Sequence, residues 1–317
     1  MNLFRSWRAG SYIIDRVITS PMFRWTWSGL SEGEYSGALR EYRPVDAETA
    51  HEMRAGRYLL ASKLVDTHGV SPFATHVDHL SWHNELHGFA WLRHFGEARG
   101  LEEREFARTL VLDWIGRNSE YNADTWGLGL SARRVMNWLR HYGLLTEGAE
   151  RKQVKTISHS IAMQVQAAKL RTPYAPDRID ELIATILPVA VALCDGSELA
   201  QIEPLVKTLC KMLKWQLDED GFYRSRNPAD QLLLIEELVS LRLTLSQRSA
   251  DLARELGGIV DDMHLALDSV TLGTGEPVYF NGCGQLPAEM IFAIQSQGTR
   301  RRKGNCAVAG YGVVELG

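Results

Sequence analysis

The sequence predicts an all-α fold, on three observations. Apolar side chains recur with the 3.6-residue period of a helix, in segments spaced roughly every 20 to 25 residues. The connections between these segments are too short to be domain linkers. Strand-like alternation is absent until residues 278–280 and 306–316. We therefore expect antiparallel helix pairs, with at most a short β segment at the carboxyl end.

The amino-terminal residues 1–45 are rich in Trp, Arg, Gly and Pro. They predict an irregular arm with one short helix near residues 11–19, packed onto the body through its aromatic side chains. Asp46 is a candidate N-cap, and helical spacing predicts one element over residues 46–66.

The central part of the chain, residues 87–145, predicts three helices and a long loop. The apolar positions are Phe89, Trp91, Leu92 and Phe95 in the first helix, Phe106, Leu110 and Trp114 in the second, and Val135, Trp138, Leu139, Tyr142 and Leu145 in the third. The loop over residues 118–131 holds Tyr121, Asn122 and Trp126, and we expect Ser131 to be the N-cap of the third helix. This loop is where we expect a ligand.

Later helices follow the same pattern. Their apolar positions span residues 154–165, 179–187, 202–213, 228–245 and 252–270, and Pro188 is expected to kink the second of them. Residues 218–228 form a polar loop before the helix that opens at Pro228 or Ala229.

Composition excludes several classes of function. The chain has 317 residues, 45% of them hydrophobic and 23% charged, with a net charge of −4. It therefore carries no global basic field of the kind that binds nucleic acid, and the run Arg300–Lys303 predicts a solvated loop. No apolar run is long enough for a membrane span or a signal peptide, so the default localisation is cytoplasmic. Four cysteines show neither pairing nor metal-ligand spacing.

Four histidines, His76, His79, His83 and His87, are spaced three, four and four residues apart. On a helix they could line one face and ligate a metal. A solvated connection between helices is the favoured alternative, because no carboxylate or cysteine in a ligand pattern accompanies them. We predict neither a metal nor any other cofactor.

Five segments in order resemble the helical amino-terminal half of the heparinase II/III family of polysaccharide lyase-like proteins, in the form common in alphaproteobacteria. The segments are His87–His94, Leu110–Asn118, Ala132–Leu139, Asp220-Gly-Phe-Tyr-Arg-Ser-Arg-Asn-Pro228 and Tyr279-Phe-Asn-Gly-Cys-Gly284. The resemblance spans roughly residues 55–315. It implies an incomplete (α/α) toroid over residues 46–300, whose groove holds an acidic polysaccharide.

The resemblance also implies a large β-sandwich domain after the toroid. Residues 301–317 look like the start of that domain and little more, so we expect a truncated or degenerate copy, an unpaired strand, or a β-sandwich domain supplied by a separate chain. Many lyases of this kind work in the periplasm, which is the alternative to the cytoplasmic default.

A polysaccharide lyase removes the proton beside a uronate carboxyl group and expels the glycosidic oxygen by β-elimination. It needs a group that neutralises the carboxylate, and a base and an acid within hydrogen-bond reach. The candidate catalytic residues are Tyr223, Arg226 and Asn227; a solvated loop with a helix starting at Asn227-Pro228 is the simpler interpretation. Candidate substrate-binding residues are Trp91, Trp126, Arg133, Asn137 and Arg224, because aromatic faces stack on sugars and Arg forks bind carboxylate or sulfate. We expect the loops at 118–131 and 218–228 to face one groove.

The catalytic set of the family is incomplete here. Where better characterised lyases carry an Asn-His pair, this chain has Arg178, Asp180 and Glu181, and where they carry a late Tyr it has Asp230 and Gln231. Three hypotheses stay open: a lyase impaired by truncation, a non-catalytic carbohydrate-binding remnant, and a helical scaffold for protein partners.

Overall fold

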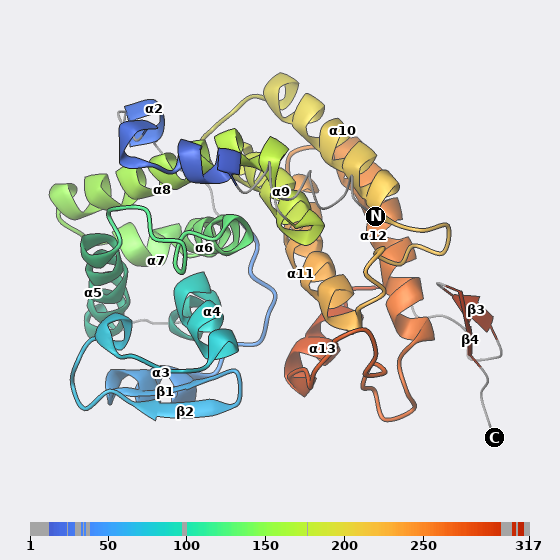
Figure 1. Cartoon of the computed structure of the whole chain (residues 1–317), viewed down its shortest axis with the longest axis horizontal. Coiled ribbons are helices and arrows are strands. Elements are labelled where there is room, and N and C mark those ends of the chain that lie inside the picture. Colours follow the sequence, from blue (N-terminus) through green and yellow to red (C-terminus); the bar gives the residue numbers. More distant parts are fainter. Residues whose placement is uncertain are drawn as a thin grey trace. The chain divides into compact units, whose positions relative to one another are not determined.

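The computed structural model describes residues 13–23, 25–28, 33, 35, 39–96, 100–175, 177–298, 306–308 and 310–313. The chain divides into two compact units. Unit 1 comprises residues 1–39 and 45–196, and unit 2 comprises residues 40–44 and 197–317. Helices dominate each unit (Figure 1), so the predicted all-α class is confirmed. The toroidal arrangement that the resemblance implies stays a prediction.

Unit 1 consists mainly of helices around α6. Its elements are η1 (Pro21–Phe23), α2 (Trp25–Ser28), α3 (Ala47–Arg54), β1 (Arg57–Leu60), β2 (Lys63–Asp66), η2 (Pro72–Ala74), α4 (Leu80–Gly88), η3 (Ala90–Phe95), α5 (Leu101–Arg117), α6 (Leu128–Arg140), α7 (Tyr142–Thr146), α8 (Arg151–Arg171), η4 (Thr172–Tyr174) and α9 (Arg178–Cys194). Helix α6 contacts α4, α8 and α9, and its side chains are almost all buried.

Aromatic side chains form the core beside α6. The ring of Trp138 packs edge-on against Trp114 at 5.5 Å and against Phe89 at 5.3 Å between centroids. Such pairs contribute roughly 0.5 to 1.5 kcal/mol each beyond the burial of their area. The periodic positions Phe106, Leu110 and Trp114 lie on α5 as predicted.

Residues 57–66 correct the prediction of one helix over 46–66. Helix α3 begins after the predicted cap, Asp46, but ends at Arg54, and Gly56 then adopts a φ of +85°. The chain continues as the antiparallel hairpin β1–β2, with Arg57 opposite Asp66. Tyr58 and Leu60 are buried while Leu59 is 61% exposed, which is strand alternation.

Two further helix boundaries differ from the prediction. Phe89 takes a left-handed conformation, with a φ of 59°, and so separates α4 from η3. Helix α6 begins at Leu128 with Gly127 as its N-cap, so Ser131 is not the cap. Pro188 lies within α9, which continues to Cys194.

The described part of the amino-terminal arm packs onto the rest of unit 1 through aromatic side chains, as predicted: Trp27 lies 5.5 Å from Trp126, and Tyr35 lies 5.5 Å from Tyr142, between ring centroids. Residues 13–18 are helical, within the short helix that was predicted. Trp27 is 1% exposed, and its indole donates to the carbonyl of Ile18 at 3.1 Å. Asp15 pairs with Arg171 of α8 at 2.6 Å.

Unit 2 contains α10 (Leu199–Gln216), α11 (Pro228–Leu245), α12 (Ala250–Ser269), α13 (Ala288–Gln295), β3 (Cys306–Val308) and β4 (Tyr311–Val313). Helix α12 packs on α10 and α11. The short connection between α11 and α12 makes these two helices an antiparallel pair, as predicted. The segment 40–44 is attached to α11 by an ion pair between Arg43 and Glu236 at 2.8 Å.

The carboxyl-terminal strands correct the expectation of an unpaired strand. β4 pairs with β3 as an antiparallel hairpin, with Cys306 opposite Val313. The run at residues 278–280, which was read as strand-like, is not a strand. The basic run 300–303 lies outside the described residues.

Candidate functional site

The loop between α10 and α11 is a tight reversal in unit 2. Leu217 and Tyr223 form an antiparallel bridge, and the Asp218 carboxylate accepts the amide of Phe222 at 2.8 Å. Gly221 has a φ of +84°, and an added Cβ would lie 2.7 Å from the carbonyl oxygen of Asp262 on α12. Only glycine fits this position, so the loop is held closely against α12.

A buried glutamine fixes the rest of the loop. Gln231 of α11 is 0% exposed; its side-chain oxygen accepts the amide of Tyr223 at 2.8 Å, and its nitrogen donates to the carbonyls of Gly221 and Met263 at 3.0 Å each. Gln231 is one of the positions at which the sequence departs from the lyase pattern. In the structure, its side chain holds the backbone of this loop in place.

Tyr223 and Asn227 do not present free groups for catalysis. Tyr223 is 3% exposed, which corrects the expectation that it faces a polysaccharide as a base. The side chain of Asn227 accepts the amide of Ala229 at 2.8 Å and caps α11. The simpler interpretation of Asn227-Pro228, a helix start, is therefore confirmed.

Arg224 and Arg226 are exposed and lie against aromatic rings. The guanidinium of Arg224 is 5.3 Å from the ring of Trp215, which is 45% exposed. That of Arg226 is 5.8 Å from the ring of Tyr311. Arginine planes held over aromatic faces keep their hydrogen-bond donors available to an anion.

The fourth and fifth segments of the family resemblance meet at Arg226. The side-chain amide of Asn281 donates to the carbonyl of Arg226 at 2.8 Å and to the hydroxyl of Tyr311 at 3.0 Å. Phe280 lies 4.8 Å from Tyr311 between ring centroids. We name the set Trp215, Arg224, Arg226, Asn281 and Tyr311 the Arg226 surface.

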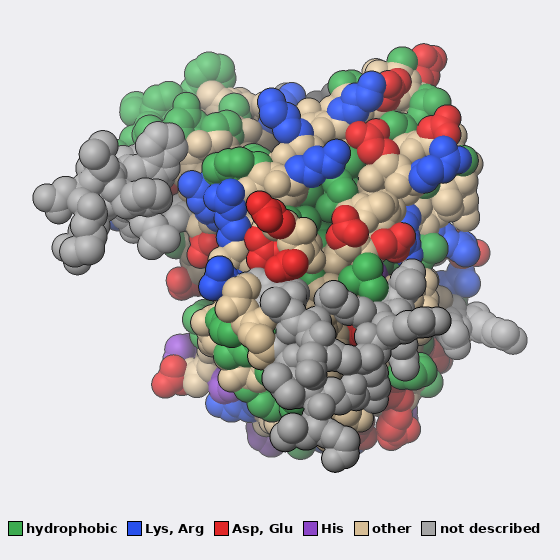
Figure 2. All heavy atoms as spheres, turned by 90° about the vertical axis from the view of Figure 1, so that its right-hand side faces the viewer, with side chains coloured by type: hydrophobic (Ala, Val, Ile, Leu, Met, Phe, Trp, Pro, Cys, Tyr) green, Lys and Arg blue, Asp and Glu red, His purple; other side chains and the backbone are tan. Residues whose placement is uncertain are grey.

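The Arg226 surface offers local rather than global attraction for an anion. Lys, Arg, Asp and Glu side chains are interspersed on the face that Figure 2 draws, in keeping with the net charge of −4. The two arginines and the exposed ring of Trp215 match groups of an acidic sugar: carboxylate or sulfate, and an apolar ring face.

Three expected sugar-binding residues of unit 1 are buried, which corrects their assignment. Trp91 and Trp126 are 2% and 1% exposed, and their indoles donate to the carbonyls of Leu86 and Asn118. Asn137 is 0% exposed and donates to the carbonyl of Gly88 at 2.7 Å. These amide and indole groups satisfy backbone acceptors inside the core.

Arg133 is partly exposed, and its charge acts on Asp180 in the first turn of α9. Burial raises the pKa of Asp180, while the charges of Arg171 and Arg133 act in the opposite direction. The amide of Gly129 also donates to the Asp180 carboxylate. The position that departs from the Asn-His pattern is thus occupied by a half-buried carboxylate with cationic neighbours. The groove that was expected to join residues 118–131 and 218–228 stays a prediction.

The histidine segment is not a solvated connection, because three of its members belong to α4 or its cap. His79 accepts the amide of Trp82 at 3.0 Å as the N-cap. His87 is 5% exposed and accepts the indole of Trp114 at 2.9 Å. Its ring lies 4.1 Å from that of His83. Across the described residues, no group of three or more His, Cys, Asp or Glu side chains is arranged to hold a metal.

The fold and the site together define an all-α protein with an exposed arginine–aromatic surface on one unit. Within the residues that the structure covers, no helix is both long and apolar enough to cross a membrane. A scan against models of known protein families finds no match.

Among curated proteins, the chain is similar to FtsZ-localized protein C of Caulobacter vibrioides (strain NA1000 / CB15N), with 27% identity over 273 residues. The alignment covers 84% of this chain and 46% of that protein. The chain therefore spans about half the length of the curated relative it matches.

Among solved structures, the chain is similar to heparan sulfate lyase HepC from Pedobacter heparinus, with a TM-score of 0.46 and 15% identity. A mutant of the same lyase gives a TM-score of 0.45 and 14% identity. Each comparison covers 85% of this chain and 43% of the lyase chain.

Proposed function

We propose that this chain is a polysaccharide lyase-like protein that binds an acidic, uronate-containing polysaccharide through the Arg226 surface, with little or no turnover by β-elimination. The observation that carries the proposal is the contact between Asn281 and Arg226, at 2.8 Å. It joins the two carboxyl-terminal segments of the sequence resemblance at one exposed place.

The proposed roles follow from the geometry of this surface. Arg224 and Arg226 bind carboxylate or sulfate groups, and the exposed ring of Trp215 offers a face on which a pyranose ring stacks. The amide of Asn281 positions the backbone of Arg226. Arg226 itself has a φ of 55°, a conformation that is uncommon outside glycine and that concentrates at binding sites.

Turnover needs more than this surface supplies. A base must lie within hydrogen-bond reach of the sugar proton, whereas Tyr223 is buried and Asn227 is engaged as a helix cap. Losing a single transition-state charge stabiliser costs roughly 2.7 to 4 kcal/mol, or 10² to 10³ in rate. With several roles vacant, binding is the activity that the residues support best.

Binding is tested by calorimetric titration of the purified chain with heparan sulfate, chondroitin sulfate and alginate, with dextran as the neutral polymer. We expect saturable, salt-sensitive binding to at least one acidic polymer. Arg224→Ala and Arg226→Ala should each weaken it about tenfold or more, because a charge-assisted hydrogen bond contributes roughly 1.5 to 3 kcal/mol. Arg254→Ala is the matched control, since Arg254 is an exposed arginine of α12 in the same unit. Equal losses in all three variants would contradict the proposed site.

Turnover is tested with the same polymers by ultraviolet absorbance, because β-elimination forms an unsaturated uronate. We expect no increase in absorbance for the wild-type chain. Robust turnover that disappears in Tyr223→Phe would contradict the proposal and make Tyr223 the base.

A second candidate function rests on the curated relative. That protein is named for localisation with FtsZ, and its similarity covers 84% of this chain. We propose, as the alternative, that the shared helical region is a scaffold that localises with FtsZ. A fluorescent fusion of this chain in Caulobacter vibrioides should then follow the FtsZ pattern, and a diffuse signal would count against it. In that case Arg226→Ala should leave the localisation unchanged.

A further inference from the structure

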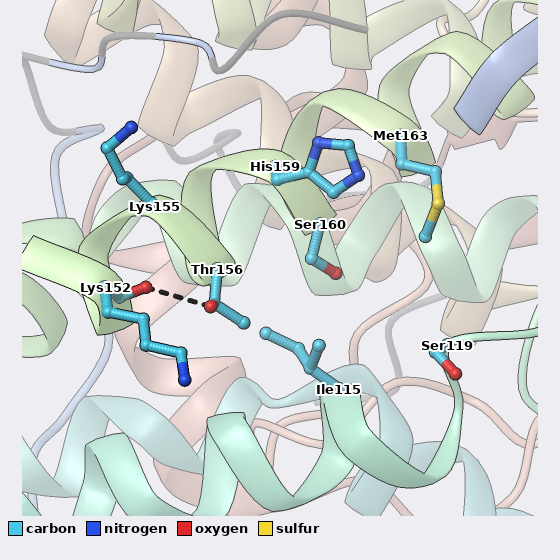
Figure 3. A pocket seen from close by; sticks show the side chains of 8 residues that line it. All are labelled: Ile115, Ser119, Lys152, Lys155, Thr156, His159, Ser160 and Met163. Atoms are coloured by element: carbon cyan, nitrogen blue, oxygen red, sulfur yellow. Dashed lines mark hydrogen bonds between the residues drawn. The ribbon is translucent and has the colours of Figure 1, made fainter. Parts of the chain in front are cut away.

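Unit 1 contains a groove between the end of α5 and the first half of α8. Its volume is about 340 Å³, and it is lined by Ile115, Ser119, Lys152, Lys155, Thr156, His159, Ser160 and Met163. Figure 3 shows Lys152, Thr156 and Ser160 on the side of α8 that faces Ile115. The groove belongs to unit 1 and shares no residue with the Arg226 surface, so it is independent of the function proposed above.

The charged side chains that line this groove are all basic. None of the eight lining residues is acidic, and two of them are lysines. Helix α8 contains Arg151, Lys152, Lys155, Lys169 and Arg171 and no Asp or Glu over its 21 residues. Arg171 is paired with Asp15, and the side chains of Lys152 and Lys155 are exposed. An anion is the complementary ligand.

A buried side chain at the floor of the groove points to the same kind of ligand. Ser160 is 3% exposed and lines the groove, with its hydroxyl directed into the space beside Ile115 (Figure 3). Among the described residues its hydroxyl accepts a hydrogen bond from Gln164 at 3.2 Å. The hydroxyl hydrogen is therefore available to an acceptor within the groove.

Gln164 connects Ser160 to a buried positive charge. The oxygen of Gln164 accepts the Nε–H of Arg134 at 2.7 Å, and Arg134 is 0% exposed. The other partners of Arg134 within the described structure are neutral: the carbonyls of His87 and Thr125, the hydroxyl of Ser131 and the ring of Trp114, whose centroid is 4.0 Å from the guanidinium carbon. A buried guanidinium without a carboxylate is costly, and an anion at the end of this hydrogen-bonded chain would partly offset its charge.

We propose that this groove binds a small molecule that carries a tetrahedral oxyanion, as a phosphate or sulfate ester, together with an apolar part. Lys152 and Lys155 supply point charges of the kind that bind such groups, and Ser160 and Thr156 supply hydroxyls. Ile115 and Met163 receive the apolar part. The volume of the groove lies at the lower end of the range for small-molecule sites, which suits a ligand of about the size of a sugar phosphate.

The test uses the full chain and two aromatic esters at constant ionic strength. Phenyl phosphate and phenyl sulfate are titrated by calorimetry, with benzyl alcohol as the uncharged analogue. We expect saturable binding of an ester and none of benzyl alcohol. The better of the two esters identifies the oxyanion. Lys152→Gln should weaken binding about fivefold or more, the loss expected for one charge contact of about 1 kcal/mol near the surface.

A matched variant separates the groove from the general charge of α8. Lys169→Gln removes an exposed lysine of the same helix that does not line the groove, and it should leave binding unchanged. Ser160→Ala should also weaken binding, with its folding checked by circular dichroism; the Lys152→Gln result decides the question if that variant does not fold. Absence of saturable binding, or equal losses in Lys152→Gln and Lys169→Gln, would overturn the proposal.

Discussion

Arg226 provides the sharpest test of the proposed polysaccharide-binding surface, because replacing it with glycine separates binding from stability. Its φ of 55° is a left-handed conformation, and its carbonyl is held by the amide of Asn281 at 2.8 Å. A left-handed conformation costs a residue with a Cβ roughly 1 to 2 kcal/mol relative to the right-handed form. Arg226→Gly removes that cost.

Two losses oppose this gain. Glycine has more conformational freedom in the unfolded chain, which costs roughly 0.5 to 1 kcal/mol. The contact of the guanidinium with Tyr311, at 5.8 Å, is lost, and an exposed contact of this kind contributes about 0.5 to 1 kcal/mol. The net change in the free energy of unfolding is therefore within about 1 kcal/mol of zero. Arg226→Ala keeps the strained backbone and loses the contact, so it should be the less stable of the two variants.

The measurements are urea denaturation followed by circular dichroism and calorimetric titration with heparan sulfate. Arg226→Gly should unfold at nearly the same urea concentration as the wild-type chain and bind about tenfold or more weakly. The reasoning is refuted if Arg226→Gly loses more than about 2 kcal/mol of stability, or if it binds as tightly as the wild type.

Two further predictions concern stability. Gly221→Ala should destabilise the chain by about 2 kcal/mol or more in urea denaturation, because the added Cβ would lie 2.7 Å from the carbonyl oxygen of Asp262 and because the φ of Gly221 is +84°. Gly258→Ala is the control: the added Cβ on α12 meets open space, so this variant should be slightly more stable than the wild-type chain. Burial, with smaller effects of His83 and Arg134, lowers the pKa of His87 to about 3 from its ordinary 6.5. The unfolded chain therefore binds this proton first, and stability falls as the pH is lowered from 6.5 towards 3. By pH 5 the share of this loss that comes from His87 should reach about 2 kcal/mol, so the loss in His87→Gln should be smaller by that amount; the remainder comes from groups such as His264, whose pKa burial also lowers, to about 4.

The helices could be predicted from the sequence wherever one helix face is continuously apolar. Phe106, Leu110 and Trp114 repeat every fourth residue, and α5 contains all three. The hairpin β1–β2 could not be predicted from the sequence, because Leu60 and Leu64 are also four residues apart and fit a helix equally well. The turn between them has positive φ at Ala61 and Ser62, where no glycine or asparagine signals it.

The exposure of the candidate site residues was predictable for Arg224 and Arg226 and not for the aromatic residues. Arg224 and Arg226 are exposed as their polar loop suggests. Trp126 lies in an equally polar loop, yet its indole satisfies a backbone carbonyl and its ring packs 5.5 Å from Trp27, about 100 residues earlier in the chain. The partner that buries an aromatic side chain is set by tertiary packing, which local sequence does not contain.

Arg134 is buried and Arg226 is exposed, and this difference decides which of the two guanidinium groups can contact a ligand directly. The guanidinium of Arg134 donates to neutral acceptors inside unit 1, including the side chain of Gln164. It acts on a ligand only through the chain that ends at Ser160. Arg226 is exposed, keeps a costly backbone conformation and has an aromatic face behind its guanidinium. The anion binding proposed for Arg226 would account for an arginine at this strained position.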